Sequence, residues 1–268
     1  MKIRCGYEIT YEVPHPSPMI LLLNVHPDRS GDLQSPDEVG FSRPVARTEY
    51  QDMFGNRCLR IMAEPGPLVI SNDFTIVDTG LPDVIVPDAE QHMVQDLPPE
   101  VLVYLLGSRY CETDRLSDTA WSLFGSVPKG WSLVQAIVDH AHERITFGYQ
   151  YARATKTAFE AYQERQGVCR DFAHLAVTLC RCMNIPARYA TGYLGDIGVP
   201  PVEDPMDFSA WFEVFLGGRW YTFDARHNRP RIGRIVMARG RDATDVAIAT
   251  TFGSAQLTGF KVVTEEVA

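Results

Sequence analysis

The chain has 268 residues, 45% hydrophobic and 22% charged, a composition typical of a globular protein with an ample core. Its net charge of -9 argues against nucleic acid or an anionic membrane surface as the main partner. No apolar run is long enough to span a membrane, and the first residues alternate as in a strand rather than as in a signal peptide. We therefore expect a cytoplasmic protein.

Residues 1–97 have the pattern of an all-β domain. Four short segments rich in β-branched and aromatic residues are separated by proline, glycine and aspartate clusters; they are residues 4–13, 19–25, 57–63 and 68–77. This spacing predicts a small β-sandwich. Residues 78–100 contain four prolines and read as a surface linker, so we place the domain boundary near residue 97.

Residues 98–268 form the second predicted domain, in which helices come first and strands follow. A short helix is expected at 99–106, a longer one from a Ser132 cap to residue 145, and a third after the capping box formed by Thr157 and Glu160. Period-two patterns predict strands at 188–194, 208–216, 219–224, 232–238, 244–250 and 260–263. The fold class is therefore α+β.

Cysteine and histidine spacing gives no sign of a metal site. Six cysteines are too few for a disulfide framework in a chain of this length, and five of them read as structural. Cys180 and Cys182 fall two residues apart on one predicted helix, where such positions do not face each other, and His140 and His142 have the same spacing. We expect neither a metal nor another cofactor.

The sixth cysteine, Cys169, begins a strongly apolar helix. Phe172, Leu175, Ala176, Leu179 and Met183 share one helical face, and Pro186 predicts that the helix ends near Asn184. The free amides and the positive end of the helix dipole in the first turn favour the thiolate, the form of cysteine that attacks carbonyls. The alternative is an ordinary core cysteine, since free cysteine is among the most buried residue types.

A predicted hairpin brings further polar residues together. Gly217 and Gly218 are typical of a two-residue turn between the strands at 208–216 and 219–224. That register places Trp211 opposite Asp224, and it makes Ser209 and Asp224 diagonal neighbours within side-chain reach.

In combination, these motifs resemble the transglutaminase-like superfamily, a papain-like group of cysteine enzymes with many bacterial members. The resemblance covers about residues 150–225 and rests on Thr155–Ala158, Gly167–Asp171, Asn184–Tyr189, Gly192–Tyr193, Ala210–Trp211 and Trp220–Asp224. It implies a papain-like core in which a central cysteine helix packs on an antiparallel sheet, preceded by a β-domain. It also implies a Cys-His-Asp triad that forms a thioester with a carboxamide, with Cys169 as nucleophile and Asp224 as orienting carboxylate.

The chain departs from this pattern at Ser209, which occupies the position of the histidine. A serine hydroxyl has no proton affinity near neutral pH and cannot act as the general base. The site is then inactive and kept for binding, or another histidine replaces the missing one, or the helix terminus and Arg170 make a thiolate that works with water. His227 qualifies only if the chain leaves the sheet after Asp224, and His174 lies about 140° around the helix from Cys169.

These observations leave three functional hypotheses. The first is a cysteine-dependent amide hydrolase or acyl transferase acting on peptides or proteins, with Trp211 either a wall of the substrate cleft or part of the core. The second is a catalytically impaired homologue that binds a peptide or a protein. The third, with the least support, is a structural component of a larger assembly. The oligomeric state does not follow from the sequence.

Overall fold

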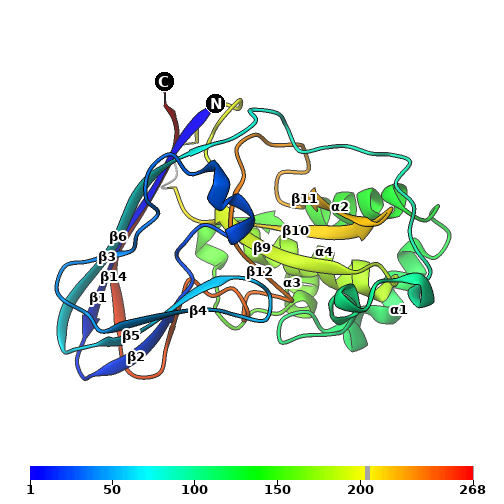
Figure 1. Cartoon of the computed structure of the whole chain (residues 1–268). Coiled ribbons are helices and arrows are strands. Elements are labelled where there is room, and N and C mark those ends of the chain that lie inside the picture. Colours follow the sequence, from blue (N-terminus) through cyan, green and yellow to red (C-terminus); the bar gives the residue numbers. More distant parts are fainter. Residues whose placement is uncertain (203–205, 268) are drawn as a thin grey trace.

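The computed structural model describes residues 1–202 and 206–267, which form a β-sandwich beside a part that combines helices with a sheet (Figure 1). One sheet of the sandwich has the strand order β14-β1-β6-β3 and the other β13-β2-β5-β4. These strands are β1 Lys2–Val13, β2 Ser17–Leu21, β3 Gly40–Phe41, β4 Arg47–Gln51, β5 Arg57–Ala63, β6 Gly66–Val77, β13 Ala249–Thr251 and β14 Gln256–Val267. The tight turn before β5 contains Gly55, whose φ of 83° only glycine adopts readily.

The expected division of the chain at residue 97 is corrected by the last two strands. Strand β14 pairs antiparallel with β1 along most of its length, and β13 pairs with β2. Both ends of the chain therefore lie in the sandwich, as Figure 1 shows. The sequence predicted strands near these positions but assigned them to the second domain, because pairing between residues some 250 positions apart leaves no local pattern.

The second part of the molecule packs helices on an antiparallel sheet of order β11-β10-β9-β12. Its elements are α1 Thr113–Phe124, α2 Trp131–Arg144, α3 Ala158–Glu164, α4 Cys169–Cys182, β9 Ala187–Tyr193, β10 Ser209–Leu216, β11 Arg219–Phe223 and β12 Ile235–Gly240, with a short parallel pair of β7 Thr146–Phe147 and β8 Gln166–Gly167. Within the described residues, no helix combines the length and apolar character needed to cross a bilayer.

Three of the four predicted helices are present as α-helices, with some differences in detail. The capping box of Thr157 and Glu160 is present. Helix α2 begins after Gly130 rather than after a Ser132 cap, and residues 99–105 form a 3-10 helix. Helix α1 was not predicted, although its buried side chains Leu116, Ala120 and Phe124 recur at the four-residue spacing of one helical face.

Helix α4 is the centre of this part and lies against β9 and β10 (Figure 1). Its predicted apolar face, from Phe172 to Met183, is buried in one cluster with Phe212 and Val214 of β10. Burial of each large apolar side chain contributes about 1.5–3 kcal/mol to folding. The helix ends at Cys182, close to the predicted end.

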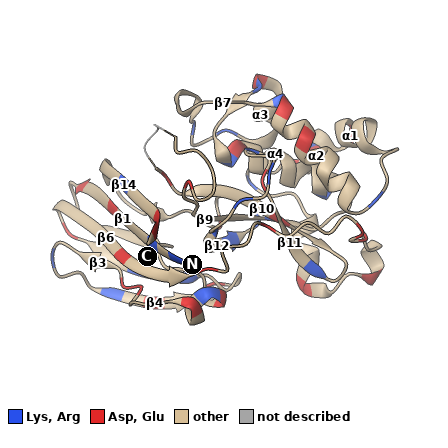
Figure 2. Cartoon of the chain, turned by 90° about the horizontal axis from the view of Figure 1, so that it is seen from above, with Lys and Arg blue, Asp and Glu red and all other residues tan. Residues whose placement is uncertain are grey.

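The two parts of the molecule share apolar and polar contacts. Tyr193, Phe208 and Ile235, from the sheet beside α4, belong to the same buried cluster as the interior of the sandwich. Figure 2 shows this sheet lying between the sandwich and the helices. The two parts are therefore not independent units of packing.

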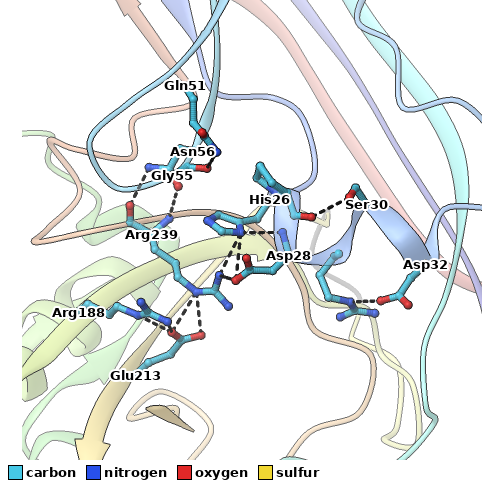
Figure 3. Close-up of polar contacts among 12 residues, drawn as sticks. His26, Asp28, Ser30, Asp32, Gln51, Gly55, Asn56, Arg188, Glu213 and Arg239 are labelled. Atoms are coloured by element: carbon cyan, nitrogen blue, oxygen red, sulfur yellow. Dashed lines mark hydrogen bonds and ion pairs between the residues drawn. The ribbon is translucent and has the colours of Figure 1, made fainter. Parts of the chain in front are cut away.

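A charged network at the same boundary is centred on Arg239 of β12 (Figure 3). Its guanidinium donates to both oxygens of Glu213, at 3.2 and 3.0 Å, and to Asp28 at 2.7 Å. Arg188 donates to the same glutamate at 2.6 Å. Asp242, close to Arg239 in sequence, also binds within the protein, because its carboxylate accepts the Tyr110 amide at 2.8 Å.

Candidate active site

Cys169 is the first residue of α4, as the sequence predicts, and its neighbours fix the start of the helix. The Asp171 carboxylate accepts a hydrogen bond from the amide of Val168 at 2.9 Å, which satisfies one of the free donors of the first turn. A Cβ atom at Gly167 would lie 2.6 Å from that carboxylate. The glycine is therefore required for the carboxylate to close over the helix start.

The Cys169 side chain is partly accessible, whereas the other five cysteines are buried and free. Burial by the surrounding atoms raises the pKa of the Cys169 thiol to about 11, although the charge of Arg226 and a backbone hydrogen bond from Ala210 act in the opposite direction. Desolvation of the thiol therefore acts against the ionisation that the start of a helix favours. At neutral pH the sulfur carries its proton and needs a base to remove it.

Asp224 and His227 lie together immediately after β11. The strand ends at Phe223, and the chain then turns so that the Asn228 amide bonds the Asp224 carbonyl at 2.8 Å. Oδ1 of Asp224 accepts the amides of Arg226 and His227, each at 3.0 Å. The chain thus leaves the sheet after Asp224, which is the condition that the sequence set for His227.

The His227 imidazole is oriented by the carboxylate of Asp224. Its Nδ1 lies 2.8 Å from Oδ2 of Asp224, and because a carboxylate only accepts, Nδ1 carries the proton in this contact. The other nitrogen, Nε2, is then the one able to accept a proton. This arrangement of carboxylate and imidazole is the one that a general-base histidine requires.

A buried arginine holds the carboxylate from its other side. Arg234 donates from Nη2 to Oδ2 of Asp224 at 2.9 Å and from Nε to Asp83 at 2.9 Å, which ties the linker after β6 to the site. Burial alone would raise the pKa of the Asp224 carboxyl, but Arg234 and His227 hold that pKa below its ordinary value. Asp224 is therefore ionised throughout the neutral range.

Cys169, Ser209 and His227 line a single cavity with an empty volume of about 750 Å³. The predicted strand register is confirmed from Leu216 opposite Arg219 to Phe212 opposite Phe223, but the pairing ends there and does not reach the predicted pair of Trp211 and Asp224. Ser209 begins β10, and the adjoining Ala210 belongs to the buried cluster against which Cys169 packs. The serine therefore lies beside the thiol, while the imidazole enters the cavity from the turn after β11.

Three other predicted residues do not join this group. His174 is fully buried, accepts the Ala243 amide through Nε2 at 3.1 Å, and has a pKa lowered to about 3 by burial. Arg170 binds the carbonyl of Arg153 and pairs with Asp171. Trp211 was expected at the cleft wall or in the core; it is buried and lines a separate cavity beneath Arg234.

Sequence reasoning missed three charged residues of the site. Arg226 and Asp207 line the cavity of Cys169, and Arg234 binds Asp224. Arg226 precedes His227 in the turn that follows Asp224, and this turn places both side chains at the cavity. Within the residues that the structure describes, no group of three His, Cys, Asp or Glu side chains is placed to hold a metal ion.

Comparison with known proteins identifies the family to which the chain is similar. Residues 122–225 match the model of the transglutaminase-like superfamily. The solved structure of a candidate cysteine protease from Cytophaga hutchinsonii is 32% identical in sequence, with a TM-score of 0.85 over 99% of this chain and 90% of the other.

Two curated relatives are uncharacterised mycobacterial proteins. One from Mycobacterium leprae is 34% identical over 94 residues, which are 34% of this chain and 33% of that protein. One from Mycobacterium bovis is 34% identical over 128 residues, 42% of this chain and 40% of that protein. The matches therefore span a third to two fifths of the length of these relatives.

Proposed function

Because this chain belongs to the transglutaminase-like superfamily, we propose that it is a bacterial cysteine enzyme that hydrolyses amide groups of peptides or proteins through a thioester on Cys169. The observation that carries the proposal is the shared cavity of Cys169 and His227, with Nδ1 of that histidine 2.8 Å from Asp224. The name of the Cytophaga hutchinsonii protein is in keeping with this activity.

In the proposed reaction, the Cys169 sulfur attacks the carbonyl carbon of the amide while its proton passes to Nε2 of His227. A carbon–sulfur bond forms, the carbon–nitrogen bond breaks, and the amine leaves with the proton from the imidazolium. Water then attacks the thioester, His227 takes a proton from it, and the acid is released with the thiol restored. The cavity is open to solvent, which favours hydrolysis over transfer to another amine.

The free cysteines support a reducing location, so we propose a cytoplasmic protein that acts on peptide or protein substrates and needs no nucleic acid, membrane or cofactor.

The direct test is trapping of the thioester. The full chain is mixed with a set of glutamine- and asparagine-containing peptides and analysed by peptide mass spectrometry. We expect an acyl adduct on Cys169 that hydroxylamine removes, and none in the Cys169→Ala protein. Absence of the adduct from the natural protein at every peptide would contradict the proposal.

Two observations favour a binding module as the second candidate. By the sequence resemblance, Ser209 occupies the position where a histidine is expected, and burial raises the pKa of the Cys169 thiol to about 11. This hypothesis predicts no acyl adduct on the natural protein and the gain of one in a Ser209→His variant. The enzyme hypothesis predicts the adduct without that substitution, because His227 already binds Asp224.

A further inference from the structure

The cavity of Cys169 is lined by three arginines, two of which have no ion pair among the residues that the structure describes. Arg226, Arg229 and Arg231 all line it. Arg231 donates to the Gly195 carbonyl at 2.9 Å and lies 3.8 Å from Asp196. Within the described ranges 1–202 and 206–267, neither Arg226 nor Arg229 forms an ion pair, so their guanidinium donors have no carboxylate partner among these residues.

Arg226 is fixed close to the nucleophile. The central carbon of its guanidinium lies 3.8 Å from the centre of the Phe147 ring, a cation–π contact that holds the group in place. Its charge favours the ionised form of the Cys169 thiol, which places it within electrostatic range of the sulfur. Arg229, in contrast, is exposed at the edge of the cavity.

Two acidic residues, Asp196 and Asp207, also line the cavity, and among the described residues neither forms an ion pair with Arg226 or Arg229. The charge of Arg226 acts to lower the pKa of Asp207, but the two side chains form no ion pair within 4 Å. Oδ1 of Asp207 accepts the Phe208 amide at 2.6 Å. Asp196 accepts the Val202 amide at 2.9 Å. These carboxylates disfavour a doubly charged phosphate and leave room for a ligand with a single negative charge.

We infer that Arg226, assisted by Arg229, binds a carboxylate of the substrate beside the amide that Cys169 attacks. The planar guanidinium presents paired N–H donors that match the two oxygens of a carboxylate. The substrate class is therefore an acidic amide, in which a side-chain or terminal carboxylate adjoins the reacting carboxamide. The inference rests on the proposed function for the identity of the reacting group, whereas recognition of the carboxylate requires no catalysis.

The test compares alkylation of Cys169 by iodoacetate and by iodoacetamide, which differ in one negative charge. The rate of alkylation of Cys169 by iodoacetate is divided by its rate with iodoacetamide, and this ratio is normalised to the same ratio for N-acetylcysteine. The normalised ratio is expected to be about 10, the effect of a unit charge several ångströms away in a partly buried site. It should fall about tenfold in Arg226→Gln, stay high in Arg226→Lys, and be unchanged in Arg60→Gln, which removes an exposed arginine on β5.

A normalised ratio at or below one in the natural protein would overturn the inference, as would an unchanged ratio in Arg226→Gln. Since the readout is alkylation, it succeeds or fails separately from thioester formation. A high ratio without an acyl adduct contradicts only the proposed function, and an adduct with an ordinary ratio contradicts only the carboxylate site.

Two peptides identify the source of the carboxylate. Acetyl-Gly-Glu-Gly-amide offers a side-chain carboxylate, and acetyl-Gly-Ala-Gly with a free C-terminus offers a terminal one. Slower alkylation of Cys169 by iodoacetamide in the presence of the first supports an internal acidic residue as ligand, and slower alkylation with the second supports a chain terminus. Protection by neither peptide at millimolar concentration contradicts the site.

Discussion

Replacing His227 by glutamine is expected to slow turnover by a factor of about 10² to 10⁴, the range that a positioned general base contributes. The Cys169 thiol is neutral in the cavity because burial raises its pKa, so attack on a carbonyl requires a proton acceptor. His227 is the histidine that lines this cavity and is oriented by a carboxylate. The measurement is the initial rate on a peptide that acylates Cys169, with kcat expected to fall and KM to change little.

A matched control is His142→Gln. The His142 ring contacts the carbonyl of Ala225, next to the same turn, at 3.1 Å, but does not line the cavity. Glutamine can donate to that carbonyl, so this variant should keep its activity. Equal losses in both variants would show a structural effect and contradict the role of His227, and so would full activity in His227→Gln.

Replacing Asp224 by asparagine is expected to destabilise the fold by about 3 kcal/mol at neutral pH, the cost of removing one partner from a buried ion pair. The carboxylate receives hydrogen bonds from Arg234, from the His227 ring and from two backbone amides. Asparagine preserves the amide contacts and leaves Arg234 with less compensation. The measurement is the free energy of unfolding in urea.

The stability lost in Asp224→Asn depends on pH, because folding lowers the pKa of the Asp224 carboxyl. The pKa of Asp224 is lower in the folded protein than in the unfolded chain, so its stabilisation is fully present above about pH 4 and is lost as the pH falls through the folded-state pKa. The difference in unfolding free energy between the natural protein and Asp224→Asn should therefore shrink as the pH is lowered from 7 to about 3. A constant difference would contradict the buried ion pair.

Asp139→Asn provides the comparison for this prediction. The Asp139 side chain accepts hydrogen bonds from Gln135 and Asn228 and has no ion pair among the residues that the structure describes. An asparagine oxygen can accept both bonds. This variant should lose far less stability than Asp224→Asn, and an equal loss would mean that the charge of Asp224 is not what matters.

Local patterns were sufficient to predict the elements around the nucleophile. The periodicity of α4 identified its buried face, and the Gly217-Gly218 turn predicted the pairing of β10 with β11 from Leu216 opposite Arg219 to Phe212 opposite Phe223. Both signals depend on residues close together in sequence, where spacing alone determines which side chains share a face.

The features that sequence reasoning could not predict depend on long-range contacts. Strand β14 pairs with β1 at the other end of the chain. Arg234, the residue before β12, binds both Asp224 and Asp83. The Cys169 pKa is a further example, because helix position favours ionisation while burial, visible only in the packed structure, opposes it more strongly. The sequence identified His227 as a candidate base. Its role depended on whether the chain leaves the sheet after Asp224, which the sequence did not determine.

The most direct test of the central claim, that Cys169 and His227 act as one nucleophile and base, is the rate of Cys169 alkylation by iodoacetamide against pH. We expect the natural protein to show a component at neutral pH, where His227 accepts the proton of the thiol, and a second one rising toward pH 11. The His227→Gln protein should keep only the alkaline component, and the other five cysteines serve as internal controls. Identical profiles in the two proteins would contradict the account.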